Sequence, residues 1–136
     1  MANTVPEISI IIPTLNEEEH IGELIRHLSD TSHHIEIIVA DGSSRDQTRV
    51  VAEREGAKVI CVENSSRPKQ LNVGADLAKA PLLYFVHADT LPPKDYARLI
   101  LAATADGRSF GSFRFKCLST RQQLTSSKFL LPQQWR

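Results

Sequence analysis

The segment "LLYFVHADTLPP", residues 82–93, runs from an apolar stretch into a polar tip that holds His87 and Asp89. A carboxylate such as Asp89 can hold a hard divalent cation against phosphate oxygens, which neutralises charge as a bond to phosphate breaks. The two residues are two positions apart, so in an extended segment both side chains face the same side. His87 would then add an imidazole, a ligand that Mn²⁺ accepts better than Mg²⁺.

Both residues also have a structural interpretation. Asp89 fits a loop residue that precedes Pro92 and Pro93, and His87 fits a hydrogen-bonded residue at the end of a strand. For His87 we favour this structural role over ligation. Asp89 is therefore the predicted metal ligand, and the predicted cofactor is a divalent cation, Mn²⁺ or Mg²⁺.

Arg67 and Lys69 stand at the start of a predicted helix. A helix N-terminus offers free backbone N–H groups and the positive end of the helix dipole. With a guanidinium added, this arrangement suits a diphosphate. Taken alone, Arg67 and Lys69 fit a solvated basic turn slightly better than they fit a diphosphate site.

Asp41 directly follows an apolar segment and precedes Gly42. Its carboxylate could accept two hydrogen bonds from a ribose or from a base edge. A turn residue before glycine, or a helix cap, explains Asp41 equally well.

The elements that must position these residues alternate along the chain. The apolar run that starts at Ile8 is typical of a strand buried on both faces, which Pro13 is expected to end. Further apolar stretches and one alternating stretch predict the remaining strands, so that strands are expected at residues 8–12, 35–39, 58–62, 81–89 and 109–118.

Helices are predicted between the strands. Asn16 is the expected N-cap of the first helix, with Glu19 as its capping-box partner. The other helices are expected at residues 45–56, where Gly56 ends the helix, at 65–80 behind a serine cap, and at 92–104 with prolines in the first turn.

This alternation predicts an α/β domain with a mainly parallel sheet flanked by helices. In such open sheets, ligands bind beyond the carboxyl ends of the strands. All four of the predicted parallel strands bring polar side chains to that edge: Pro13, Thr14, Asn16 and Glu17; Asp41 to Ser44; Asn64 to Arg67; and His87, Asp89 and Thr90.

Composition excludes several classes of function. The 136 residues suit one domain. Because 16 basic residues balance 16 acidic residues, non-specific electrostatic binding to nucleic acid is not expected. Cys61 and Cys117 lack metal-ligand spacing and predict buried thiols in a reducing compartment. With no signal-peptide pattern and no apolar run long enough to span a bilayer, we expect a cytoplasmic protein, or one peripheral to a membrane.

Four blocks of this chain together resemble the first half of an inverting family 2 glycosyltransferase. The blocks are "ISIIIPTLNEE", "IEIIVADGSSRDQT", "RPKQLNVGA" and "LLYFVHADTLPP", and their order and spacing match over about residues 8–115. The resemblance implies a Rossmann-like GT-A domain that binds a nucleotide-diphosphate sugar and transfers the sugar, with inversion, to an acceptor. We expect one domain over residues 1–136, in which 116–136 form a tail, either a helix or a frayed end.

The resemblance also implies roles for individual residues. Pro13, Thr14 and Glu17 would line the nucleoside pocket, and Asp41 would contact base or ribose, although the usual pair of aspartates is here Ala40-Asp41. Arg67 and Lys69 would face the diphosphate. His87, Ala88 and Asp89 occupy the place of the DxD metal motif, with His87 in place of the first acid; "HADT" is similar to a subgroup of small bacterial family 2 enzymes.

The chain departs from the family in length. Family members carry a second half with the acceptor site and the general base, whereas residues 107–136 here contain no Asp or Glu. The sequence therefore predicts a donor-binding domain whose acceptor half is truncated, with self-association through the surface left uncovered. The alternative is a catalytically incomplete nucleotide-sugar-binding or assembly module. A nucleotidyltransferase is disfavoured, because "PTLNEEE" is acidic and lacks glycine where those enzymes carry a Gly-rich basic loop.

Overall fold

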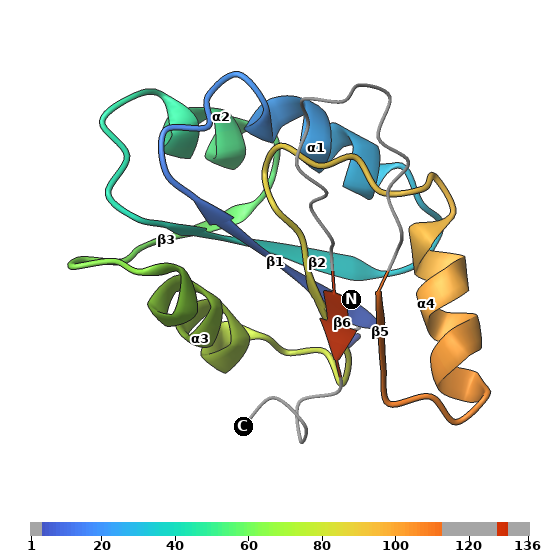
Figure 1. The fold of residues 1–136 in the computed structure, drawn as a ribbon. Coiled ribbons are helices and arrows are strands. Elements are labelled where there is room, and N and C mark those ends of the chain that lie inside the picture. Colours follow the sequence, from blue (N-terminus) through green and yellow to red (C-terminus); the bar gives the residue numbers. More distant parts are fainter. Residues whose placement is uncertain (1–3, 113–127, 131–136) are drawn as a thin grey trace, which may run out of the picture.

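A computed structural model describes residues 4–112 and 128–130 of the chain (Figure 1). In these residues one sheet has the strand order β3-β2-β1-β4-β6-β5. Strand β1 pairs in parallel with β2 and β4, β2 pairs in parallel with β3, and β6 pairs antiparallel with β4 and β5. The mainly parallel sheet is thereby confirmed, with strands β1 (Ile8–Thr14), β2 (Ile35–Asp41), β3 (Lys58–Cys61), β4 (Leu83–Phe85), β5 (Phe110–Ser112) and β6 (Lys128–Leu130).

Helices cover both faces of the sheet, as the α/β prediction requires (Figure 1). On one face, α1, α2 and α4 pack in the larger hydrophobic core, whereas α3 packs on the opposite face. The described helices are α1 (Ile21–Ser29), α2 (Thr48–Arg54), α3 (Arg67–Leu77) and α4 (Tyr96–Ala105).

The position of β1 between two layers of helices explains why its sequence is an apolar run. Ile10 and Ile12 face the larger core, whereas Ile11 faces α3. Because helices cover both faces, each side chain of the strand is buried. Helix α3 approaches this strand closely at Gly74, where a Cβ atom would lie 2.5 Å from Cγ2 of Ile11.

The first helix begins later than predicted. Helix α1 starts at Ile21 with His20 as N-cap residue, and no side chain caps it. Asn16 instead has a left-handed backbone with φ of 53°, which is incompatible with an N-cap, and its side chain accepts a hydrogen bond from Arg45 N at 2.9 Å. The predicted capping box is therefore wrong, because tertiary partners take the Asn16 side chain.

Proline positions also differ from the prediction. Strand β1 continues through Pro13 to Thr14, and Pro13 is in register with Ala40 of β2. Pro92 and Pro93 precede α4, whose first residue is Tyr96. A residue followed by proline avoids helical backbone angles, and the Pro92 carbonyl accepts a hydrogen bond from His27 Nε2 at 2.6 Å.

The end of the chain and the described cysteine give further corrections. Residues 128–130, expected in a helix or a frayed end, form β6 between β4 and β5. The predicted strand 109–118 is described only as β5, and its remainder, like Cys117, lies outside the described residues. Cys61 is exposed, not buried, because β3 lies at the edge of the sheet formed by the described strands, next to β2. In the described part of the chain, no helix is long and apolar enough to cross a membrane.

Candidate functional site

The loops that leave β1, β2 and β3 share an uncommon backbone feature. Asn16, Ser43 and Asn64 each have positive φ, of 53°, 67° and 48°, and they are the non-glycine residues with positive φ in the described part of the chain. Such conformations cost free energy and persist only where the surroundings impose them. All three lie at the carboxyl edge of the sheet, where the sequence predicted the ligand site.

Asp41 is the buried centre of this edge. Its Oδ1 accepts hydrogen bonds from Thr14 Oγ1 at 2.7 Å and from Ser44 Oγ at 2.6 Å, and its Oδ2 accepts one from Ser44 N at 2.8 Å. Arg49 Nε lies 3.8 Å from the same Oδ2. With no exposed surface, Asp41 links the end of β1 to the loop after β2, a tertiary role that differs from the turn or cap role considered above. Its contact with base or ribose stays a prediction.

Hydrogen bonds join the loop after β1 to the loop after β2. Asn16 N donates to Ser44 Oγ at 2.8 Å, and Glu17 N donates to Thr48 Oγ1 at 2.8 Å. Glu18 exchanges hydrogen bonds with the start of α2: its N–H donates to Asp46 Oδ2, and its Oε2 accepts from Gln47 N. The backbone that carries Glu17 is therefore fixed by partners from a distant part of the sequence.

Gln70 joins the same two strands from the opposite face. Its Nε2 donates to the carbonyl oxygens of Thr14, at 2.8 Å, and of Ala40, at 2.9 Å. Gly42 lies beside it, where a Cβ atom would be 2.6 Å from Ser65 Oγ and 3.2 Å from Gln70 Nε2. Only a residue without a side chain lets the loops after β2 and β3 approach this closely.

Four of the predicted residues form a charged cluster at this edge: Glu17, Arg67, His87 and Asp89. Burial and the Asp89 carboxylate raise the pKa of Glu17, while the Arg67 guanidinium acts against them. Burial and Arg67 lower the pKa of His87, and Asp89 acts against them. Arg67 Nη1 is hydrogen-bonded to His87 Nδ1. The fold thus brings residues from the loop after β1, the first turn of α3 and the turn after β4 within electrostatic reach of one another.

The segment of His87 and Asp89 is a turn, not the extended strand that we expected. Strand β4 ends at Phe85, and Thr90 N donates to the His87 carbonyl at 3.1 Å. Ala88 and Thr90 are buried, while Asp89 between them is exposed. The turn therefore anchors its alternate residues in the protein and leaves the Asp89 carboxylate accessible to a ligand.

The remaining predicted site residues contribute less to this surface. Lys69 belongs to the first turn of α3, but its Nζ donates to the Glu63 carbonyl at 2.7 Å. Pro13 lies in buried strand β1, and Ala88 packs in the larger core. Their contact with a ligand stays a prediction.

Sequence reasoning did not find the residues that support the site. Gln70, Asp46 and Thr48 act through hydrogen bonds to segments far away in the sequence, and no local pattern reports such partners. In the sequence, Ser44 is only one polar residue of its loop. The burial of Gln70 depends on the fold, so the sequence carried no signal for it.

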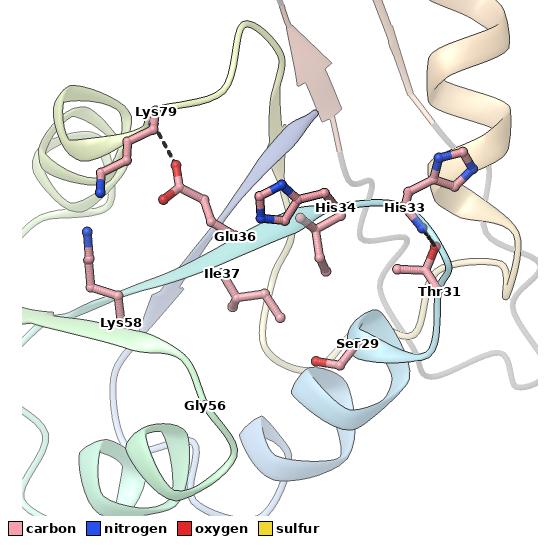
Figure 2. A pocket seen from close by; sticks show the side chains of 10 residues that line it. Ser29, Thr31, His33, His34, Glu36, Ile37, Gly56, Lys58 and Lys79 are labelled. Carbon is pink, nitrogen blue, oxygen red and sulfur yellow. Dashed lines mark hydrogen bonds between the residues drawn. The ribbon is translucent and has the colours of Figure 1, made fainter. Parts of the chain in front are cut away.

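A separate hollow of about 510 Å³ lies at the opposite edge of the sheet, at the start of β2 (Figure 2). Lys58, His34 and Glu36 line it, and Glu36 Oε1 accepts a hydrogen bond from the backbone of Lys79. None of the predicted site residues is among those that line this hollow. The predicted ligand edge and this hollow are therefore distinct places.

Comparison with known proteins identifies the family. The model of the family described as Glycosyl transferase family 2 matches residues 9–134. The chain belongs to glycosyl transferase family 2. The resemblance seen in the four sequence blocks is thereby confirmed.

Curated relatives from this comparison carry varied substrate names. The chain is 34% identical over 93 residues to 4,4'-diaponeurosporenoate glycosyltransferase of Staphylococcus haemolyticus, covering 63% of this chain and 25% of that protein. It is 35% identical over 108 residues to the succinoglycan biosynthesis protein ExoA of Rhizobium meliloti, covering 72% of this chain and 33% of the relative. The chain thus spans about a quarter to a third of the length of these relatives.

Solved structures confirm the GT-A type of Rossmann-like fold. Glucosyl-3-phosphoglycerate synthase from Mycobacterium tuberculosis, in complex with Mn²⁺, UDP and glucosyl-3-phosphoglycerate, matches with a TM-score of 0.77 at 18% identity. The match covers 94% of this chain and 57% of that one. Staphylococcus aureus TarS 1-349 matches with a TM-score of 0.71 at 24% identity, covering 86% and 38%. At these identities the similarity shows the fold alone.

Proposed function

We propose that this chain holds the donor site of a glycosyltransferase that transfers a sugar, with inversion, from a nucleotide-diphosphate sugar to an acceptor. The observation that carries the proposal is the cluster of Glu17, Arg67, His87 and Asp89 at the carboxyl edge of the sheet. Arg67 supplies positive charge at the start of α3, which is also the positive end of the helix dipole. Thr14 and Asp41 position the neighbouring loops for the nucleoside.

The carboxylates of this cluster fit a divalent cation. Asp89 raises the pKa of Glu17, so the two carboxylates lie close enough to repel each other, and a cation between or beside them would relieve that repulsion. No group of three or more His, Cys, Asp or Glu that could hold a metal exists in the described residues. A cation held by Asp89 would therefore need phosphate oxygens and water as further ligands, as Mg²⁺ and Mn²⁺ sites on nucleotides commonly do. When bound, the cation would stabilise negative charge on the departing diphosphate.

Solved relatives support a nucleotide-sugar donor. Structures of the mycobacterial synthase contain Mn²⁺ with UDP or with UDP-glucose. The names of the curated relatives include 4,4'-diaponeurosporenoate glycosyltransferase, undecaprenyl-phosphate 4-deoxy-4-formamido-L-arabinose transferase and validoxylamine A glucosyltransferase. Because these acceptors differ widely, the proposal is restricted to the donor class.

A second candidate function is a module that binds the donor without transferring its sugar. Inverting transfer needs a base that deprotonates the acceptor hydroxyl, whereas the cluster of Glu17, Arg67, His87 and Asp89 is proposed to bind the donor. Incubation with UDP-glucose and simple sugar or lipid acceptors distinguishes the two candidates. Clear turnover by this chain would exclude the binding module.

Calorimetric titration with UDP and GDP, each with and without Mn²⁺, tests the donor site. We expect one nucleotide to bind more tightly with Mn²⁺, and Asp89→Ala to weaken that binding by roughly tenfold or more, or about 1.4 kcal/mol, only when Mn²⁺ is present. Asp76→Ala, which changes an exposed acid of α3, is the matched control and should leave the affinity unchanged. Equal affinity of the Asp89 variant in Mn²⁺ would refute the metal role, and absence of binding by folded protein would refute the donor site.

A further inference from the structure

The hydrogen bond between Arg67 and His87 fixes the chemical form of the histidine. Arg67 Nη1 faces His87 Nδ1, and a guanidinium carries donors and no acceptor. Nδ1 must therefore accept the hydrogen bond, which leaves it without a proton. In the neutral ring the single proton is then on Nε2, so the second nitrogen is a donor.

This arrangement removes His87 from the set of metal ligands. A histidine binds a metal through a nitrogen that has a free lone pair, but Nδ1 already accepts from Arg67 and Nε2 carries the proton. Ligation would require that Arg67 move away or that the ring exchange its tautomer. Glu17 and Asp89 remain as the carboxylates of the cluster that can bind a cation.

The same arrangement gives the cluster two donor groups, one at each end of the line that runs from the guanidinium through the imidazole ring. The guanidinium of Arg67 and the Nε2–H of His87 come from the start of α3 and from the turn after β4. A neutral histidine at position 87 also removes the negative charge that an acid would have there. Two donors separated by one ring, with reduced negative charge around them, suit an extended anion that has several oxygens, such as a diphosphate.

The turn is built firmly enough to hold this geometry. Val86 N donates to the Ile11 carbonyl at 3.0 Å, which extends the pairing of β4 with the central strand up to the residue before His87. Ala88 is buried in the core, and Thr90 N donates back to the His87 carbonyl at 3.1 Å. The backbone of His87 is thus fixed on both sides, while its ring is half-buried at the edge of the cluster.

We propose that His87 is a diphosphate-binding residue: its Nδ1 holds the Arg67 guanidinium in place, and its Nε2–H donates to a phosphate oxygen of the donor. The proposal rests on the proposed function, since it assigns a role within that donor site. It replaces the metal-ligand role that the position of His87 in the motif suggests.

The tautomer is tested first, on the unaltered chain without nucleotide. Long-range ¹H–¹⁵N NMR spectra distinguish a protonated Nε2 from a protonated Nδ1, and loss of one signal set in His87→Asn assigns the ring. We expect the Nε2–H form in the unaltered chain, and a mixture of tautomers in Arg67→Met, which removes the hydrogen-bond donor. A predominant Nδ1–H form in the unaltered chain would overturn the proposal.

The binding role is tested with UDP and GDP as probes, each with and without Mn²⁺. His87→Leu removes both hydrogen-bonding nitrogens and should weaken binding by roughly tenfold under both conditions. His87→Asn keeps one acceptor and one donor and should stay within about threefold of the unaltered chain. His34→Leu, at the opposite edge of the sheet, is the matched control. Thermal unfolding of each variant shows whether it is folded.

The outcomes separate this proposal from the donor-site proposal. If the unaltered chain binds nucleotide and His87→Leu weakens binding only with Mn²⁺, His87 is a metal ligand and the present inference is wrong, while the donor site stands. Equal binding by His87→Leu under both conditions would also overturn the inference alone. If the folded, unaltered chain binds neither nucleotide, both proposals fall.

Discussion

Replacement of Gln70 by methionine tests whether one buried side chain holds the donor edge together. Gln70 is 6% exposed, and its Nε2 donates to the carbonyl oxygens of Thr14 and Ala40. These two carbonyls stand at the ends of β1 and β2, directly before the loops of the candidate site. Methionine has a similar size and shape but donates no hydrogen bond, so the change removes both links and leaves the packing largely intact.

The expected loss of stability follows from the two hydrogen bonds. Each contributes about 1 kcal/mol net, so Gln70→Met should lower the free energy of unfolding by about 2 kcal/mol. The cost should not be larger, because the Thr14 carbonyl keeps a hydrogen bond from Gly42 N at 2.9 Å. Amide exchange at Gly42 should become faster, since the strand end that holds this amide is released, while exchange at Ile38 within β2 should change little.

Urea unfolding measured by circular dichroism gives the change in the free energy of unfolding, provided that the variant and the unaltered chain have equal m-values. Gln47→Met is the matched control, because Gln47 is exposed, and its effect should stay within about 0.5 kcal/mol. A change below about 0.5 kcal/mol for Gln70→Met, with unaltered exchange at Gly42, would refute the reasoning. It would mean that the ends of β1 and β2 are held without Gln70.

Two further predictions concern packing and pH. Gly74→Ala should destabilise the protein by about 1 kcal/mol, because crowding against Ile11 Cγ2 outweighs the helix propensity gained; in an Ile11→Ala background, urea unfolding should instead show stabilisation. Burial alone would raise the pKa of Asp46, but the hydrogen bonds that its carboxylate accepts, mainly from Thr48 and Glu18, together lower that pKa from its ordinary value of 3.8. The Asp46 carboxylate therefore stabilises the fold above pH 3.8 and loses this effect as pH falls through the lowered pKa. Asp46→Asn should lower the free energy of unfolding at pH 7 by less than about 1 kcal/mol, seen as a lower melting temperature. At low pH, where Asp46 is protonated, the melting temperatures of the variant and the unaltered chain should be equal.

Local patterns were sufficient for the types of element and insufficient for their ends. The apolar run of β1 and the serine cap of α3 predicted real elements, because their signals depend on neighbouring residues. The predicted N-cap at Asn16 failed, because its side chain accepts from Arg45 and its backbone is left-handed. That competing partner is 29 residues away, so no local rule could weigh it.

The sequence alone determined the α/β architecture and the family, since buried strands, amphipathic helices and four ordered motif blocks are all written in local residue order. It also named Glu17, Arg67, His87 and Asp89. Only the tertiary structure decided that Asp41 and Gln70 are buried links between strands, and that His87 hydrogen-bonds to Arg67 in a turn. The physical reason is that hydrogen bonds and burial depend on which distant segments meet, and only the folded chain brings the ends of β1, β2 and β4 to one edge.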